Sequence, residues 1–197
     1  MKLIGVIGPI GAGKDTIAEY LIQTQGFKKL SFASRVKDVA AVAFGWDRTL
    51  LEGDTFASRV WRETTDPVWN ITPRHALQQI GTEMFRAHIA DDFWIRIVQA
   101  QIKQAEPNTK GIVITDCRFE NEIQMIQRMG GIILHVQRDP PPLWAKEAME
   151  GIPFDTDRSI HITEWNAWAF SPNANYHIEN TGSLDFLHEQ IQQCIID

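Results

Sequence analysis

Short apolar runs alternate with longer stretches of helical periodicity along this chain. The uninterrupted apolar runs predict buried strands at 2–7, 27–32, 111–116, 132–136 and 176–179. Apolar residues that recur every three to four positions predict helices at 14–25, 33–44, 91–105 and 119–129, with others that begin at 72 and 184. Strands joined by helical crossovers are typical of a parallel sheet with helices on both faces. We therefore predict one three-layer α/β domain over 1–197, with about five parallel strands.

Two stretches interrupt this alternation. Residues 46–72 lack a clear period, and we expect an irregular region there whose three tryptophans, Trp46, Trp61 and Trp69, form a small satellite core. Residues 138–172 begin with proline breaks and read as a polar excursion, which we predict to be a lid over the ligand site.

A glycine-rich turn joins the first predicted strand to the first predicted helix. Such a turn lets backbone N–H groups point inward at an anion, and the helix N-terminus adds further unpaired N–H groups. A lysine then supplies a mobile charge for the outer phosphates. The predicted nucleotide-binding residues are Gly8, Gly11, Ala12, Gly13, Lys14, Asp15 and Thr16.

This loop departs from the common form at one position. The residue after Lys14 is usually Ser or Thr, whose hydroxyl binds Mg²⁺, but here it is Asp15, and a hydroxyl follows in Thr16. Asp116 ends a predicted buried strand, where phosphate-loop enzymes place a magnesium-organising carboxylate. We predict Asp15, Thr16 and Asp116 as the metal site, and which of the first two touches Mg²⁺ stays open.

Composition narrows the class of protein. The chain is 44% hydrophobic and 22% charged with a net charge of −6, which argues against a general nucleic-acid binder. Two cysteines form no disulfide framework, so we expect a reducing compartment, the cytoplasm. No signal peptide or membrane-spanning run is expected.

Arginines and glutamines mark where a second substrate would bind. Arginine suits a monophosphate, and an amide suits the edge of a nucleobase, although a solvated polar face explains the helix from 72 equally well. The same helix carries an apolar stripe, Leu77, Ile80, Met84 and Ala87, at α-helical spacing. The acceptor candidates are Arg62, Arg74, Gln78, Gln79, Arg86 and Arg118. Arg138 and Arg158 are the candidates for charge neutralisation from the lid, whereas His161 reads as a surface residue.

These motifs together give the chain a family resemblance. It resembles the deoxynucleoside monophosphate kinases of tailed bacteriophages and related viruses and bacteria. The matching segments are GAGKDT at 11–16, LEGDT at 51–55, SRVWRE at 58–63, TPR at 72–74, LQQIGTE at 77–83, Arg86, DDFWI at 91–95, TDCRF at 115–119 with Asn121 and Glu122, and HITE at 161–164.

The resemblance implies a P-loop kinase fold with a lid. It implies that the enzyme transfers the γ-phosphate of ATP to a deoxynucleoside monophosphate and yields a diphosphate for DNA synthesis. Lys14 and the loop would then hold ATP, while Thr16 and Asp116 would organise Mg²⁺. The family also suggests a homodimer, and we expect neither a nucleic-acid nor a membrane partner.

Three other functions stay open. A kinase of the same fold acting on dephospho-coenzyme A or phosphomevalonate is the first of them. A nucleotide-switched binding protein is the second, although the chain has no Asn-Lys-x-Asp run. A DNA-dependent ATPase is the third, and the acidic charge counts against it.

Overall fold

The computed structural model describes residues 1–155 and 159–196, and these fall into two compact units. Residues 1–31 and 104–197 form the first unit, and residues 32–103 form the second. Among the described residues, no helix is long and apolar enough to cross a membrane.

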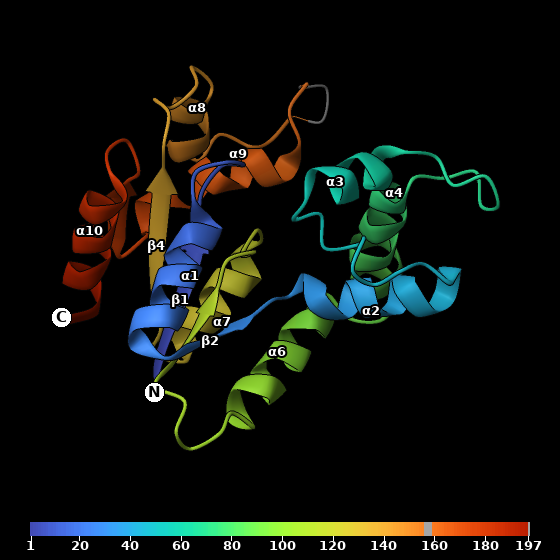
Figure 1. Ribbon diagram of the computed structural model, residues 1–197. Helices are drawn as coiled ribbons and strands as arrows, with labels where there is room; N and C mark the ends of the chain where they lie inside the picture. Colours follow the sequence, from blue (N-terminus) through green and yellow to red (C-terminus); the bar gives the residue numbers. More distant parts are fainter. Residues whose placement is uncertain (156–158, 197) are drawn as a thin grey trace. The chain divides into compact units, whose positions relative to one another are not determined.

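The first unit contains a five-stranded parallel sheet, as predicted. Its strands are β1 (Lys2–Ile7), β2 (Phe27–Leu30), β3 (Gly111–Ile114), β4 (Ile132–Gln137) and β5 (Tyr176–Glu179). They lie in the order β2-β3-β1-β4-β5, and every neighbouring pair is parallel (Figure 1). The second and third strands end two residues earlier than predicted. Ser31, Thr115 and Asp116 therefore lie just beyond strand ends, where loops of α/β proteins carry their ligands.

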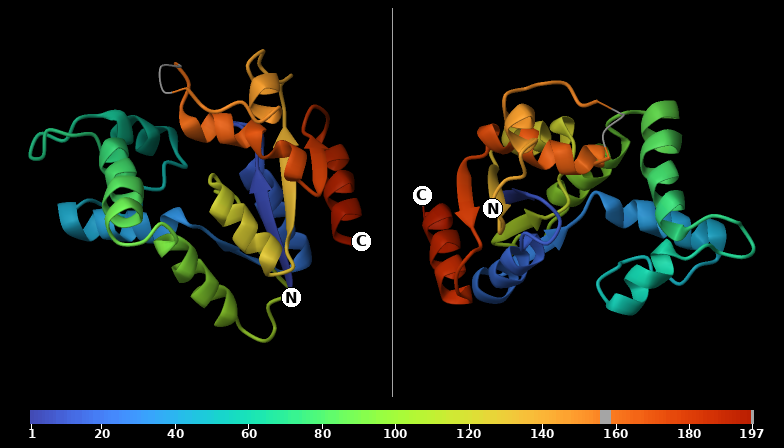
Figure 2. Two further views of the ribbon diagram at one scale, coloured as in Figure 1. Left: turned by 180° about the vertical axis from the view of Figure 1, so that it is seen from behind. Right: turned by 90° about the horizontal axis from the view of Figure 1, so that it is seen from above.

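Helices cover both faces of this sheet. One face packs on α1 (Lys14–Gln25) and α10 (Leu184–Ile196) through a core that includes Ile17, Leu21, Leu187 and Ile191. The other face carries α7 (Glu120–Arg128), which Figure 2 shows in front of the sheet when it is seen from behind. A Cβ on Gly5 would lie 2.6 Å from Ile126 Cδ1, so this helix packs directly against the backbone of the central strand. The predicted three-layer order is confirmed.

The segment 138–172 is less polar than predicted. It contains α8 (Ala145–Met149), α9 (Ile162–Ala169) and a short 3₁₀ helix, η2 (Ser171–Asn173). Trp165 and Trp168 are each 3% exposed and pack with two buried alanines in a cluster of their own. The expectation of a polar excursion was wrong. Prolines and charged residues dominate the start of the segment, whereas its buried apolar residues are divided between α8 and α9 and form a cluster only when the two helices pack together.

The second unit is entirely helical in its regular structure. Its elements are α2 (Ala33–Phe44), α3 (Phe56–Glu63), α4 (Pro73–Gln78), the π-helix η1 (Gln79–Met84), α5 (Phe85–His88) and α6 (Phe93–Lys103). The satellite core is confirmed for Trp46, which is 9% exposed, and for Trp61, which packs against its cluster. It is wrong for Trp69, which is 47% exposed and contacts the edge of the cluster through the ring of Phe44.

The region 46–72 is not irregular throughout, because α3 lies within it. Thr55 caps this helix: its Oγ1 accepts from Ser58 N at 3.1 Å, and Ser58 Oγ accepts from Thr55 N at 3.0 Å. This is a capping box in which serine replaces the usual Glu or Gln. The sequence prediction missed the helix because its start lacks the common acidic signature.

The π-helix changes which side chains of the helix from 72 are buried. A wider turn adds a residue, so the face that points inward shifts by one position. Met84 is 55% exposed and Ala87 is exposed, contrary to the predicted apolar stripe, whereas Phe85 packs on the core and Arg86 is 8% exposed. Ile80 keeps its predicted place in the core.

Candidate phosphate-binding site

Glycine conformation shapes the loop between β1 and α1. Gly8, Gly11 and Gly13 all have positive φ angles, at 149°, 79° and 104°. A Cβ on Gly8 would lie 2.2 Å from Val136 O, so the loop runs against the backbone of β4. Only glycine satisfies both constraints at this position, and the curled backbone leaves amide groups available at the start of α1.

Lys14 folds back over this loop. Its Nζ donates to Gly8 O and to Pro9 O, each at 2.8 Å. Burial, and then the charge of Arg118, lower the pKa of Lys14, while Glu164 and Asp15 oppose the shift. The ammonium group is therefore held at the loop by carbonyl groups that a bound phosphate could replace as its partners.

Two residues that the sequence analysis did not select also touch the loop. Asn180, just after β5, donates from Nδ2 to Ala12 O at 2.9 Å and is 7% exposed. Glu164, in the first turn of α9, accepts a hydrogen bond from Ile10 N at 3.3 Å through Oε2. The sequence could have indicated Asn180 as a site residue, because it directly follows a predicted strand and ligand-site residues gather at the carboxyl ends of parallel strands.

The carboxylate of Asp15 is held by two neighbouring strands. Lys29 Nζ, on β2, donates to Asp15 Oδ1 at 2.8 Å, and Thr115 Oγ1, just after β3, donates to the same oxygen at 3.1 Å. Burial would raise the pKa of Asp15, but the hydrogen bond and charge of Lys29, followed by Thr115, lower it overall. Asp15 is ionised at neutral pH.

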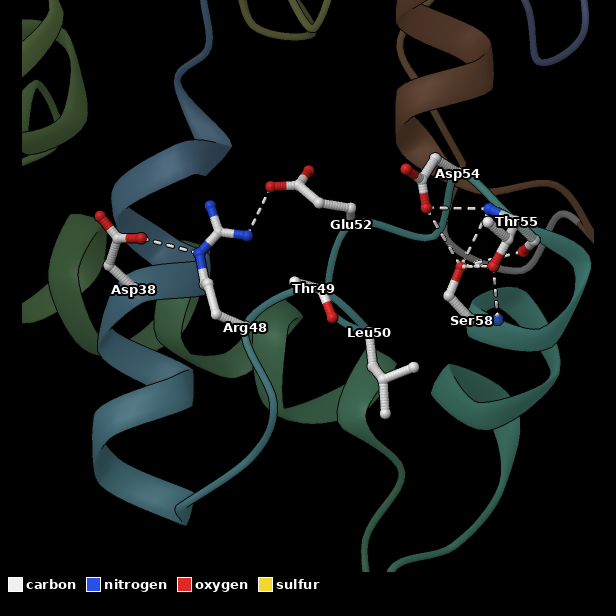
Figure 3. Close-up of a pocket in the computed structure, with 8 residues that line it drawn as sticks. All are labelled: Asp38, Arg48, Thr49, Leu50, Glu52, Asp54, Thr55 and Ser58. Atoms are coloured by element: carbon white, nitrogen blue, oxygen red, sulfur yellow. Dashed lines mark hydrogen bonds and ion pairs between the residues drawn. The ribbon is translucent and has the colours of Figure 1, made fainter.

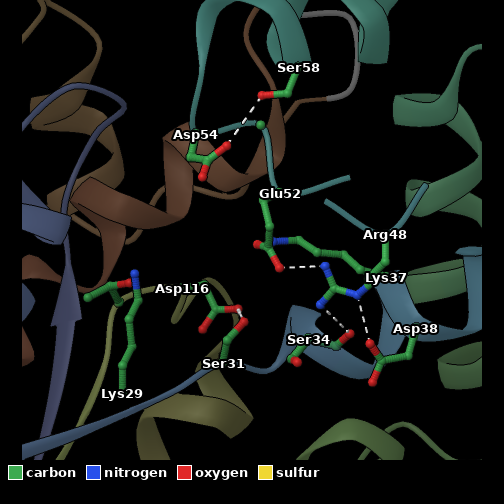
Figure 4. Close-up of polar contacts among 12 residues, drawn as sticks. Lys29, Ser31, Ser34, Lys37, Asp38, Arg48, Glu52, Asp54, Ser58 and Asp116 are labelled. Carbon is green, nitrogen blue, oxygen red and sulfur yellow. Dashed lines mark hydrogen bonds and ion pairs between the residues drawn. The ribbon is translucent and has the colours of Figure 1, made fainter. Parts of the chain in front are cut away.

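Asp116 lies close by and is also fixed. Its Oδ2 accepts from Ser31 Oγ at 2.7 Å, a contact drawn in Figure 4. Asp15, Thr16 and Asp116 offer carboxylate and hydroxyl oxygens, the hard donors that Mg²⁺ prefers, so these residues fit the ion. When bound by these residues, Mg²⁺ would supply positive charge that stabilises the charge developing on the phosphate oxygens.

Arg118 is the predicted acceptor residue that lies in this unit. Its exposed side chain is near enough to Lys14 to lower the pKa of that lysine. Its backbone N–H donates to Glu122 Oε2 at 2.7 Å, and its carbonyl accepts from Asn166 of α9 at 2.8 Å. Arg138 directly follows β4 and is exposed, whereas Arg158 lies outside the described residues.

The other acceptor candidates belong to the helical unit. Arg74 pairs with Glu63 at 2.7 Å, and Arg62 Nη1 donates to Glu52 O at 3.3 Å. Arg86 donates to Asp91 O at 3.3 Å from the interior of the unit. Gln78 and Gln79 are exposed on consecutive positions where α4 passes into the π-helix.

The helical unit also contains a polar cavity of about 500 Å³ (Figure 3). Arg48 lies between Asp38 and Glu52 and donates to both, with its Nε 2.7 Å from Asp38 Oδ1. On the opposite side, Asp54 Oδ1 accepts from Thr55 N at 2.9 Å. The guanidinium of Arg48 is thus engaged by carboxylates within the cavity wall. The lining residues are Asp38, Arg48, Thr49, Leu50, Glu52, Asp54, Thr55 and Ser58.

Sequence comparison identifies the family. A family model described as deoxynucleotide monophosphate kinase matches residues 51–191, well over half of the chain. The chain belongs to the deoxynucleotide monophosphate kinase family. The match covers the π-helix, Asp116 and the part of the cavity lining that follows residue 50.

Individual relatives agree with this assignment. A protein of Acanthamoeba polyphaga mimivirus whose name assigns it to the same family is 31% identical over 149 residues, which cover 70% of this chain and 75% of that protein. A deoxynucleoside-5'-monophosphate kinase of Escherichia phage T5 is 24% identical, over 64% of this chain and 71% of its own. Among solved structures, TT1252 from Thermus thermophilus has a TM-score of 0.50 at 19% identity and covers 99% of this chain and 96% of its own. As a member of the deoxynucleotide monophosphate kinase family, the protein is a phosphotransferase with the P-loop kinase fold.

Proposed function

We propose that this protein transfers the γ-phosphate of ATP to a deoxynucleoside monophosphate and releases the deoxynucleoside diphosphate and ADP. The observation that carries the proposal is the loop at 8–16, in which Lys14 Nζ donates to two loop carbonyls. Asp15 follows this lysine, and the charge of Arg118 is near enough to lower the pKa of the lysine. A nucleophilic oxygen of the acceptor phosphate attacks the γ-phosphorus, and the bond to the β-phosphate oxygen breaks. Positioning and charge stabilisation supply most of the catalysis in such a site.

Each group of residues has a proposed role. Lys14 and the loop amides bind the ATP phosphates, and Asp15, Thr16 and Asp116 hold Mg²⁺ with those phosphates. Arg138 and Arg158 act from the segment 138–172. The proposed acceptor residues are Arg62, Arg74, Gln78, Gln79, Arg86 and Arg118. We also propose that the enzyme works in the cytoplasm, where both nucleotides are available.

The direct test is ADP release from ATP–Mg²⁺ with each deoxynucleoside monophosphate and each ribonucleoside counterpart in turn. Turnover with one or a few deoxy acceptors is expected, and it would name the preferred base. Lys14→Ala should reduce that turnover by about 100-fold or more, because it removes the mobile charge of the phosphate site. Lys146→Ala is the matched control, since Lys146 is an exposed lysine that pairs with Glu150 at 3.7 Å. A lack of turnover with every acceptor, in protein that still binds ATP, would overturn the proposal.

The role of Arg74 has its own test. Arg74→Ala should raise the KM for the monophosphate about tenfold and leave the KM for ATP unchanged, because it removes one charged contact to the acceptor phosphate. Arg96→Ala is a suitable control, as Arg96 is also exposed and pairs with Asp92 at 2.9 Å in the same unit. Equal acceptor kinetics in the two variants would remove Arg74 from the site.

A further inference from the structure

Asp15 creates an electrostatic problem for a phosphate loop. It stands directly after Lys14, at the beginning of α1, where the loop must accept a highly charged triphosphate. A hydroxyl at this position, as in most P-loops, would carry no charge. A carboxylate repels the phosphates unless another charge balances it.

The contacts of Asp15 identify the balancing group. Lys29 Nζ lies 2.8 Å from Asp15 Oδ1, and Thr115 Oγ1 donates to the same oxygen at 3.1 Å. Lys14 also lowers the pKa of Asp15 through its charge, but after Lys29 and Thr115, and its Nζ donates to Gly8 O and Pro9 O. We propose that Lys29 is a positioning residue that fixes Asp15 and cancels its charge toward the triphosphate, so that the loop can carry a carboxylate in place of a hydroxyl.

The location of the pair distinguishes it from an ordinary surface ion pair. The side chains of Lys29 and Asp15 are 43% and 73% exposed, and such a pair contributes little to folding stability. We expect the pair to change the affinity for the ligand instead, because Asp15 directly follows Lys14 of the phosphate loop. Thr115 is 7% exposed and donates to the carboxylate from just beyond the neighbouring strand, so Asp15 is held by two side chains.

The preceding residue offers a matched control. Lys28 and Lys29 are consecutive in the edge strand β2, so their side chains point to opposite faces of the sheet. Lys28→Met and Lys29→Met remove the same charge from the same strand, but only the second removes the partner of Asp15. Lys29→Arg keeps the charge.

The experiment measures the equilibrium affinity of the full chain for ATP, first with EDTA and then with saturating Mg²⁺. Lys29→Met should weaken metal-free ATP binding about tenfold, because the unbalanced carboxylate faces the phosphates, and should weaken ATP–Mg²⁺ binding less, because the cation replaces the missing charge. Lys28→Met should stay within about twofold of wild type, and Lys29→Arg should retain most of the affinity.

A double mutant decides whether Lys29 acts through Asp15. In an Asp15→Ser background, Lys29→Met should change the affinity by less than about twofold, because no carboxylate remains to be balanced. An equal loss in both backgrounds would mean that Lys29 acts on the phosphates directly and would overturn the inference, as would an unchanged affinity of Lys29→Met. Thermal unfolding of each variant checks that it is folded.

The inference rests on the proposed function, because it requires ATP on this loop. Different results would contradict the proposed function and the role of Lys29. If wild-type protein does not bind ATP, the proposed function is contradicted. If wild type and Lys29→Met bind ATP equally tightly, with and without Mg²⁺, only the role of Lys29 is contradicted.

Discussion

At the scale of single residues, His135 is a buried base within the sheet. It is 1% exposed on β4, its ring lies 5.2 Å from that of Trp168, and its Nε2 has no hydrogen-bond partner among the described residues. Burial, followed by the charges of His177 and Lys14, lowers the pKa of His135 to about 4. The imidazole is therefore neutral in the folded protein at neutral pH.

This burial predicts a pH dependence of stability. The unfolded chain, with a histidine pKa of 6.5, binds a proton that the folded chain does not bind until about pH 4. The free energy of unfolding should fall as pH drops through this window, by about 3 kcal/mol in total. Urea unfolding of wild type and His135→Leu between pH 4 and 7 measures the difference. The variant should show a flatter pH dependence than wild type, whereas His75→Gln, at an exposed position, should follow wild type.

At the scale of elements, the π-helix decides which residues of the helix from 72 stabilise the second unit. Regular α-helical spacing would bury Met84 and expose Phe85, but the structure reverses these positions. The reversal also turns the side chain of Arg86 inward, where its Nη1 donates a hydrogen bond to the backbone oxygen of Asp91.

Two substitutions test this register. Phe85→Ala should lower the free energy of unfolding by about 2 kcal/mol, because it leaves a gap in a partly buried cluster. Met84→Gln should cost less than about 0.5 kcal/mol, because its side chain is largely in solvent. Chemical denaturation of both variants provides the measurement. A larger cost for Met84→Gln would show that the helix is regular in solution.

At the scale of the whole molecule, both cysteines are buried in the sheet-containing unit. Burial, followed by the charges of Glu122 and Asp116, raises the pKa of the Cys117 thiol well above its ordinary value, and Cys194 is 7% exposed. Neither thiol should react with an alkylating reagent until the chain opens.

Cysteine labelling should therefore report on unfolding and on ligand binding. ATP at about 100 times its dissociation constant should slow labelling about 100-fold, which corresponds to about 2.7 kcal/mol of added stability. The measurement is the rate of thiol modification with and without ATP–Mg²⁺, with urea-denatured protein as the control for complete reaction. Rapid labelling of native protein would contradict the burial of both thiols.

The sequence predicted the parts of the fold that depend on simple periodicity. The bounds of α1, α2 and β5 agree with the prediction because glycine or turn residues mark their ends. The π-helix was not predictable from α-helical spacing, and α3 lacked the usual capping signature. The partners of Asp15 were not predictable either, because Lys29 and Thr115 meet it only through the pairing of β2 with β3.

The pairing of β1 has a consequence for synthesis on the ribosome. This strand is made well before its neighbours in the sheet, since β3 and β4 begin at Gly111 and Ile132. Asn180, which holds Ala12, comes later still. A nascent chain therefore carries the loop at 8–16 without the strands that shape it until β3 and β4 have been made. ATP binding should begin only after the segment with Asn180 has emerged, so shorter nascent chains would not compete for nucleotide.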